Sequence, residues 1–440
     1  MFCLGKNNRA VGPQGMAIFI CLAACSAPAQ EALRNSLAGD AAAESRNRQM
    51  QSPQALQDYT FKEGDFRLLL TPMVGVNWND NVNLSNTNAL DDFIVIPSLG
   101  ITTSYPISQR NLLYLDITIG YDRYLYHPEW SSFDLNSSSG TGLSFDIDVK
   151  DVTINLHDWI SYVEGLGQNS AVASTAVATV ANTASYGTFQ NTAGLSGTWD
   201  LNQVKLTLGY DHQNILATSE QFSQIDHSSE MLTARAGLQV HPEVTVGLES
   251  TASFTAYEKN VLNNNDAYTV GPYLDFRPGA FFTCTVRGGY STYQFQNTSA
   301  TLQTASQDSW YAGLTITHQP TEFVSYGLSA GRETQLGVES DLVQDWYVRP
   351  NVTWSVIKGL DLVTTLSYEH GTQGVGSVGS LPGSANDTFD FYGGGLSLKH
   401  AFTSQLALSL NYRLTVRASN MSNEAYTQNL VGLQLTYHPK

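Results

Sequence analysis

Polar and apolar side chains alternate along most of this chain, and the stretch from Leu113 to Leu125 shows the pattern clearly. Its odd-numbered positions are apolar apart from Arg123, and its even-numbered positions include two carboxylates, Asp116 and Asp122. Successive side chains of a β-strand point to opposite faces, so this stretch is expected to form a strand with one apolar and one polar face. Arg123 falls near the end of the strand, where a long cationic side chain can reach lipid headgroups.

The same alternation begins at Phe66 and recurs in about 18 segments, without a helical region that would cover their apolar faces. A tilted strand needs roughly 9–11 residues to cross a bilayer, and most of the segments exceed that length. Sixteen strands is the alternative count, because two segments are weakly patterned and rich in Ser or Gly, namely 137–149 and 386–401. The predicted segments are 66–78, 92–105, 111–126, 137–149, 152–163, 187–199, 203–214, 228–240, 244–257, 267–277, 281–295, 306–318, 322–334, 341–356, 360–370, 386–401, 405–419 and 425–437.

Long polar connections alternate with tight turns between these segments. The connections Asp80 to Asp91 and Gly165 to Tyr186 are long, whereas Pro106 to Arg110 and Val149 to Asp151 are short. Outer-membrane barrels have long loops on the outside and short turns on the periplasmic side, and soluble sandwiches or propellers have no reason to sort loop length in this way. An even number of strands would place both termini in the periplasm.

A sheet with one apolar face cannot end inside a membrane, because each unpaired backbone N–H or C=O group in hydrocarbon costs several kcal/mol. The sheet must therefore close on itself. The sequence predicts an all-β fold, a transmembrane antiparallel up-and-down β-barrel of about 18 strands with lipid outside and a polar lumen inside.

The N-terminus has the features of a secretion signal. A short basic region precedes the apolar core Met16 to Ala24, and Ala27-Pro28-Ala29 offers a cleavage site. The alternative is a lipoprotein signal, because Leu22-Ala23-Ala24-Cys25 resembles a lipobox, which would make Cys25 the lipidated first residue. The predicted division of the chain is a signal peptide over 1–29, a flexible periplasmic extension over 30–65 and a barrel over 66–440.

The chain is acidic, with 22 Lys and Arg against 39 Asp and Glu and a net charge of −17. Removal of the signal would also remove Lys6 and Arg9, which leaves 20 bases against 39 acids and a net charge of −19. Such a chain is a poor candidate for binding nucleic acid, because that binding depends on Lys and Arg at the phosphates. Only 14% of the residues are charged, whereas Tyr, Phe and Gly are plentiful, which favours strands and turns.

The polar faces of the predicted strands supply the candidate functional residues. The inward-facing acids and bases are equal in number once five further charged residues are added to the lumen candidates given below, so we expect weak charge selectivity. The five further residues are Asp146, Asp148, Asp211, Glu369 and Lys399. Inward aromatic residues such as Tyr124 are candidates for contact with sugars. The candidates for lining the lumen are Arg67, Asp116, Asp122, Tyr124, Lys205, Arg235, Glu249, Asp275, Arg277, Arg287, Arg349, Asp361, Arg413 and Arg417.

Patterns for metal binding and catalysis are weak. The spacing of Asp146, Asp148 and Asp151 could suit calcium, but the glycine and the terminal Glu of an EF-hand loop are missing. The nine His residues show no H-x-x-x-H or H-E-x-x-H spacing, and the chain has no G-x-S-x-G motif. We therefore expect no catalytic residues, no metal and no cofactor.

The first two predicted strands carry a family resemblance. The element Trp78-Asn79-Asp80-Asn81-Val82 ends the first strand, the acidic pair Asp91-Asp92 follows, and Ile94 to Leu99 with Pro97 belongs to the second. These elements resemble the opening of a family of bacterial outer-membrane β-barrel porins, the second group of such barrels, which is often linked to exopolysaccharide loci. The resemblance implies an outer-membrane barrel from about residue 66 onward, and it supplies no catalytic residues.

The sequence leaves three functions open, all located in the outer membrane of a Gram-negative bacterium. The first is a porin-like, weakly selective channel for small hydrophilic solutes, in which Gly165 to Tyr186 would fold into the lumen as a constriction. The second is a barrel that assists exopolysaccharide export, and the third is a non-conducting structural or adhesive barrel. We do not expect an enzyme. The expected partners are outer-membrane lipid and lipopolysaccharide, the barrel-assembly machinery through the C-terminal strand, and, for the export function, polysaccharide.

Overall fold

The computed structural model describes most of the chain beyond residue 57. The described residues are 58–107, 112–137, 142–164, 187–218, 220–300, 302–338, 340–375, 377–379, 387–420 and 425–439. The predicted signal peptide, its two cleavage alternatives, most of the predicted extension and the loop Gly165 to Tyr186 lie outside them, so these predictions stay predictions.

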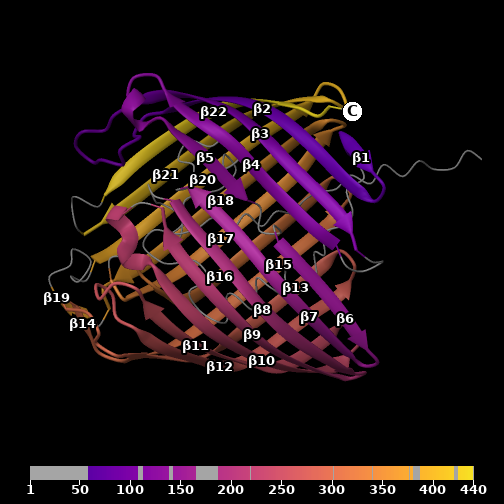
Figure 1. Ribbon diagram of the computed structural model, residues 1–440, viewed down its shortest axis with the longest axis vertical. Coiled ribbons are helices and arrows are strands. Elements are labelled where there is room, and N and C mark those ends of the chain that lie inside the picture. The colour runs from indigo at the N-terminus through magenta and orange to yellow at the C-terminus, as the bar shows by residue number, and fades with distance from the viewer. Residues whose placement is uncertain are drawn as a thin grey trace, which may run out of the picture.

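Strands dominate the described residues, joined by irregular connections and two short 3-10 turns, Pro128–Trp130 and Glu220–Ile225 (Figure 1). Each strand follows from the alternation in the sequence, and most of the bounds agree with the predicted segments within about two residues. The strands are β1 (Phe61–Glu63), β2 (Phe66–Asn79), β3 (Asp92–Pro106), β4 (Leu112–Tyr124), β5 (Ser132–Ser137), β6 (Gly142–Val149), β7 (Val152–Glu164), β8 (Gly187–Leu201), β9 (Val204–Ala217), β10 (His227–His241), β11 (Val244–Tyr257), β12 (Asn265–Gly279), β13 (Phe282–Phe295), β14 (Leu302–Thr304), β15 (Gln307–Thr321), β16 (Val324–Leu336), β17 (Leu342–Ile357), β18 (Leu360–Gln373), β19 (Ser377–Gly379), β20 (Asp387–Ala401), β21 (Leu406–Ser419) and β22 (Tyr426–Tyr437).

The sheet closes into a barrel. Antiparallel pairing runs from each strand of the wall to the next and returns from β22 to β2, where Met73 to Asn79 pair with Thr436 to Leu430. The described residues contribute 18 wall strands, which confirms the predicted fold. The count of sixteen is wrong, because β20 pairs along its length with both β18 and β21.

Two local predictions need correction. The segment 137–149 is predicted to be one strand, but only Gly142–Val149 of it forms β6, and β5 (Ser132–Ser137) precedes it. Both β5 and β6 lie between β4 and β7 as two parts of one wall strand. The extension was expected to be flexible up to residue 65, but β1 pairs with β2 across Phe61 to Glu63. Strand β1 lies beside the first residues of β2, which β22 does not reach. It therefore supplies backbone hydrogen-bond partners for an edge of β2 that would otherwise be open.

The two ends of the barrel differ. One end carries the tight connections, and we call it the short-turn end; the other, the long-loop end, carries the long connections. Three of the tight turns use a left-handed backbone, at Lys150, Asn202 and Gly359, with φ of 55°, 67° and 81°. Such residues let a two-residue turn match the twist of the paired strands. The described start of the chain, β1, and the end of β22 both lie at the short-turn end, since β1 pairs with the start of β2 and Tyr437 pairs with Leu406 (Figure 1).

The two faces of the wall differ in chemistry, as the alternation predicts. Large apolar side chains such as Leu208 and Leu248 point outward and are 66% and 60% exposed. Polar side chains such as Asn77 and Gln213 point inward and are fully buried. An exposed apolar band around a closed sheet is what a bilayer-embedded barrel requires, because the lipid covers that band. Among the described residues, no helix has the length and apolar character needed to cross a membrane.

Candidate functional site in the barrel lumen

The fourteen residues that the sequence selects for the lumen all lie on wall strands, on the face opposite to the exposed apolar side chains. The structure brings several of them together on neighbouring strands and leaves others apart. Their positions are Arg67 on β2; Asp116, Asp122 and Tyr124 on β4; Lys205 on β9; Arg235 on β10; Glu249 on β11; Asp275 and Arg277 on β12; Arg287 on β13; Arg349 on β17; Asp361 on β18; and Arg413 and Arg417 on β21.

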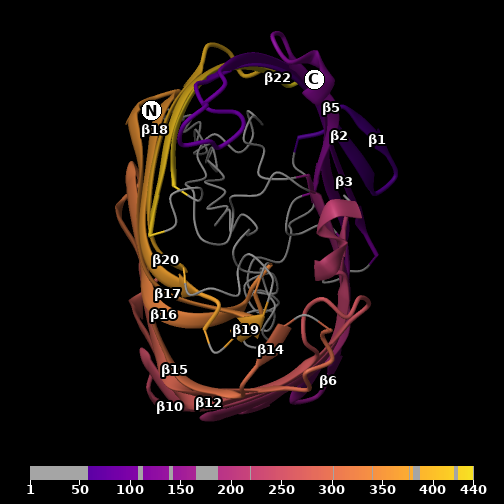
Figure 2. The same cartoon turned by 90° about the vertical axis from the view of Figure 1, so that its left-hand side faces the viewer.

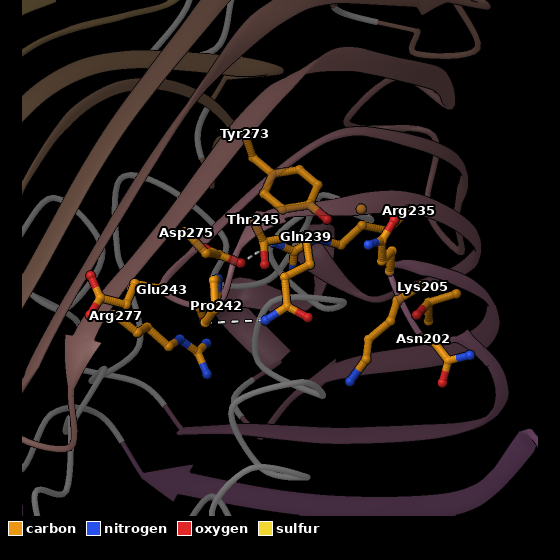
Figure 3. A pocket seen from close by; sticks show the side chains of 13 residues that line it. Asn202, Lys205, Arg235, Gln239, Pro242, Glu243, Thr245, Tyr273, Asp275 and Arg277 are labelled. Atoms are coloured by element: carbon orange, nitrogen blue, oxygen red, sulfur yellow. Dashed lines mark hydrogen bonds and ion pairs between the residues drawn. The ribbon is translucent and has the colours of Figure 1, made fainter.

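A cavity of about 350 Å³ lies inside the wall near the short-turn end, and we call it the short-turn cavity (Figure 3). Strands β9 to β12 and the turns that join them supply its lining. Three bases and two acids lie on it, so its charges do not cancel. The charged lining residues are Lys205, Arg235, Glu243, Asp275 and Arg277.

Arg235 and Asp275 form the fixed part of this cavity. The Arg235 guanidinium donates to the Asp275 carboxylate at 2.9 Å and stacks on the Tyr273 ring, with 3.6 Å from its central carbon to the ring centroid. The other carboxylate oxygen of Asp275 accepts a hydrogen bond from the Thr285 hydroxyl at 2.9 Å. Charge-assisted bonds and stacking on a planar guanidinium hold its orientation. Arg235 therefore lies as a flat, oriented cation on the cavity lining.

The other two bases of the short-turn cavity are less constrained. The Lys205 ammonium lies 3.0 Å from the Asp200 carboxylate, but both side chains are largely exposed to the interior, so this contact is weak. Figure 3 shows the long side chains of Lys205 and Arg277 on opposite sides of the cavity. Gln239 lies between them and donates to the backbone carbonyl of Pro242 at 3.2 Å. The cavity thus combines bases with neutral donors and acceptors, which suits a small polar solute.

Elsewhere in the lumen, two arginines each pair with a buried carboxylate. Arg349 donates to Glu369 at 2.5 Å and stacks on Tyr347, at 4.3 Å from the ring centroid. Arg417 donates to Asp387 at 2.7 Å, and both side chains are buried. The acid of this second pair was missed by the sequence analysis, because it begins β20 directly after a loop and has no alternating context on its N-terminal side.

Connections at the long-loop end fold over the lumen. Their apolar side chains pack with the strand ends, and β14 pairs with β19, so that the β13–β15 and β18–β20 connections meet. Figure 2 shows β14 and β19 inside the outline of the barrel. The sequence predicts a constriction from a different loop, Gly165 to Tyr186, and its alternation does not indicate β14 or β19. We call the packed side chains the loop cluster; its buried members are Ile225, Tyr257, Leu262, Ala267, Tyr293, Phe295, Leu302, Leu336, Val338 and Leu342.

A buried carboxylate ties the connections of the loop cluster together. Asp341 is 1% exposed and directly precedes β17. Its carboxylate accepts from the backbone and side-chain amides of Asn263, at 2.8 and 2.7 Å, and from the Thr304 hydroxyl. Burial raises the pKa of the Asp341 carboxyl above its usual value, and the hydrogen bonds from Asn263 and Thr304 only partly offset this effect.

Three other carboxylates, including two from the calcium-like spacing, accept hydrogen bonds from nearby residues and so have structural roles. Asp146 accepts from Asn155 at 2.6 Å, and Asp148 accepts from Thr153 at 2.8 Å across the β6–β7 hairpin. Asp92 accepts three backbone N–H bonds from residues 125–127 and closes the loop after β4. Among the described residues, no group of three or more His, Cys, Asp or Glu side chains has the geometry of a metal site.

Comparisons with known proteins find structural similarity alone. No protein-family model matches the chain, and no curated protein matches it. The chain is similar to OccK2 (OpdF) of Pseudomonas aeruginosa, solved in complex with glucuronate, with a TM-score of 0.45 and 11% identity over 85% of this chain and 98% of that one. It is also similar to a BenF-like porin from Pseudomonas fluorescens Pf-5 (TM-score 0.45, 11% identity, 85% and 99% covered) and to OccAB3 of Acinetobacter baumannii (0.44, 9%, 86% and 99%).

Proposed function

We propose that this chain is a porin-like channel of the bacterial outer membrane for small hydrophilic solutes, with the short-turn end in the periplasm. The observation that carries the proposal is the short-turn cavity, a space of about 350 Å³ lined by charged residues inside a closed barrel with an apolar exterior. Pockets for small ligands measure roughly 300–1,000 Å³, so this space accommodates a solute of monosaccharide size.

Weak charge selectivity follows from the pairing of lumen charges. Asp275 binds an arginine in the short-turn cavity, and Glu369 and Asp387 each bind one elsewhere in the lumen, so these six charges cancel in pairs. The short-turn cavity has one more base than acids, so a slight preference for anions is expected there. The loop cluster narrows the opposite end, and it would set the upper size of the solute.

Reconstitution of the full chain tests the proposal. In planar bilayers we expect discrete single-channel steps, with a reversal potential in a salt gradient that indicates a small anion preference. In liposome swelling we expect permeation by arabinose and exclusion of raffinose. A folded barrel, verified by its heat-modifiable mobility, that neither conducts ions nor admits arabinose would contradict the channel function.

The export and the non-conducting functions predict different results in the same measurements. A polysaccharide exporter should admit raffinose once the loop cluster is loosened, whereas a structural or adhesive barrel should stay closed to ions and sugars. Neither function is favoured by a specific contact or cavity in the described residues, and both stay hypotheses from the sequence.

A further inference from the structure

The line along which β15 and β16 adjoin, which we call the β15–β16 seam, loses its backbone pairing before it reaches the long-loop end. The two strands pair from Thr321 with Val324 up to Ala312 with Arg332. Beyond that pair, β15 continues to Gln307 and pairs with β13, and β16 continues to Leu336 and pairs with β17. Four successive backbone pairs are therefore missing between β15 and β16, a gap of roughly 14 Å at 3.4 Å per residue.

In other hairpins with a short turn, the backbone ladder between the two strands is complete at the long-loop end. Strand β10 pairs with β11 up to His227 with Tyr257, and β12 pairs with β13 up to Asn265 with Phe295. In each of these hairpins the ladder reaches the ends of both strands. The β15–β16 hairpin has strands of similar length, so the gap is a local opening of the wall rather than a short strand.

The loop cluster explains the opening. Leu336 ends β16 and is 1% exposed, because it packs inside the loop cluster with Leu342 at the start of β17. Burial of these two leucines draws the tip of the β16–β17 hairpin toward the lumen, while β15 follows β13 along the wall.

Side chains bridge the gap in place of the ladder. The Arg332 guanidinium reaches across to β15, where it donates to the backbone carbonyl of Trp310 and, at 3.0 Å, to the Ser309 hydroxyl. The Ser309 and Thr334 hydroxyls lie 3.1 Å apart. From inside the barrel, the Tyr293 hydroxyl donates to the backbone carbonyl of Thr334 at 2.9 Å. Side-chain bonds of this kind can be exchanged with a ligand, whereas a backbone ladder cannot.

Arg332 faces a different environment on each side of the wall. Outside, Trp310 and Trp346 are about half exposed, and their rings lie edge to face at 5.2 Å with the guanidinium 4.5 Å from the Trp310 centroid. Inside, Arg332 lines a cavity of about 40 Å³ together with the lumen residues Glu249 and Arg287. One cation therefore touches both the lumen and the aromatic belt, which marks the level of the lipid headgroups.

We propose that the unpaired part of the β15–β16 seam, between the Ala312–Arg332 pair and the long-loop end, is a lateral portal between the lumen and the bilayer. We further propose that it binds a single-chain amphiphile with a carboxylate headgroup. This proposal rests on the membrane location that is part of the proposed function. A guanidinium binds a carboxylate through two parallel N–H donors, and the two indole rings offer apolar flanks for a hydrocarbon chain. A carboxylate on Arg332 would replace the Trp310 carbonyl and the Gln344 amide oxygen, which now lies 3.2 Å from the guanidinium. Binding would thereby break the contacts of Arg332 with Trp310 and Gln344, which now connect the strands across the gap.

The first experiment measures binding of cis-parinaric acid to the full chain in detergent, through energy transfer from its seven tryptophans, of which Trp310 and Trp346 flank the proposed site. We expect saturable binding that weakens about tenfold or more in Arg332→Gln and that Arg332→Lys partly retains. The methyl ester of the same acid should bind weakly to the wild type and to Arg332→Gln alike. Equal binding of acid and ester, or equal binding of the acid to wild type and Arg332→Gln, would overturn the headgroup assignment.

A second experiment closes the seam without altering Arg332. In a background with the four native cysteines replaced, Ser309→Cys with Thr334→Cys would form a disulfide across the gap, where the two hydroxyls are already in contact. Ser229→Cys with Thr255→Cys is the matched control, because those hydroxyls lie 2.9 Å apart on the continuous β10–β11 ladder. We expect oxidation to abolish cis-parinaric acid binding in the first pair, reduction to restore it, and neither to matter in the control.

Ion conductance, measured on the same variants in planar bilayers, separates this proposal from the channel function. The cross-linked seam should conduct as the wild type does, because the short-turn cavity lies at the other end of the barrel. Wild-type or reduced protein that binds cis-parinaric acid but never conducts ions would count against the channel function and leave the portal standing. Cis-parinaric acid binding that survives oxidation of the Ser309–Thr334 pair would exclude the portal, whatever the conductance.

Discussion

Asp275 sets the charge balance of the short-turn cavity, because its carboxylate compensates Arg235 at 2.9 Å. We expect Asp275→Asn to leave three bases against one acid and to raise the preference for anions about threefold, since a unit charge at roughly 7 Å in water is worth about 0.6 kcal/mol. The reversal potential in a salt gradient measures this change. Asp308→Asn is the control, because Asp308 belongs to the outward face of β15 and should leave the ratio unchanged.

Asp341 makes the packing of the loops depend on pH. Its pKa is raised in the folded protein by burial, so the folded loops bind a proton more tightly than the unfolded chain, whose carboxyl titrates near 3.8. The contribution of Asp341 to the stability of the loop cluster is therefore greatest at acid pH and falls as the pH rises through the raised pKa. We expect proteolysis of the long loops to accelerate from pH 4 toward neutrality in the wild type.

Asp341→Asn provides the comparison for this pH effect. The amide cannot titrate, so its proteolysis rate should lose the acceleration toward neutral pH that Asp341 causes. It should also be higher than that of the wild type at pH 4, because an amide NH₂ would face the donors of Asn263 and Thr304, at a cost of about 1–3 kcal/mol. A variant that kept the wild-type pH profile would show that Asp341 is not the titrating group.

The loop cluster is expected to determine the width of the channel mouth. Leu302 lies on β14 and is fully buried in the cluster, so Leu302→Ala should cost about 2–5 kcal/mol of local packing. We expect larger single-channel steps or more frequent opening, measured in planar bilayers. Leu238→Ala, which shortens an exposed outward side chain on β10, should conduct as the wild type does. Unchanged steps in Leu302→Ala would mean that the cluster does not narrow the conducting path.

The sequence was sufficient for elements whose signal is local and repeated. Strand β10, predicted at 228–240, runs from His227 to His241, because an alternating run of fifteen residues has one way to bury its polar face inside a closed barrel. Strands β14 and β19 have three residues each, too few for a periodic signal, although Leu302 in a polar loop was a hint. The pairing of Arg235 with Asp275, and the gap beyond Arg332, depend on neighbouring strands, so alternation along one strand cannot reveal them.

A closed barrel in a bilayer requires that consecutive residues of one strand face different solvents, lipid outside and water inside. Leu208 and Thr207 follow each other on β9, yet Leu208 is 66% exposed on the apolar exterior, while Thr207 lines the short-turn cavity. An arginine on the lipid face of a barrel costs about 2–4 kcal/mol near the bilayer midplane, and a lumen substitution avoids this cost because water solvates it. We therefore expect Leu208→Arg to lower the free energy of unfolding from lipid vesicles by this amount, and Thr207→Arg to leave it nearly unchanged. Denaturant titration of the two variants measures the difference. Equal losses would mean that both faces meet the same solvent, and the barrel would then not be embedded in a bilayer.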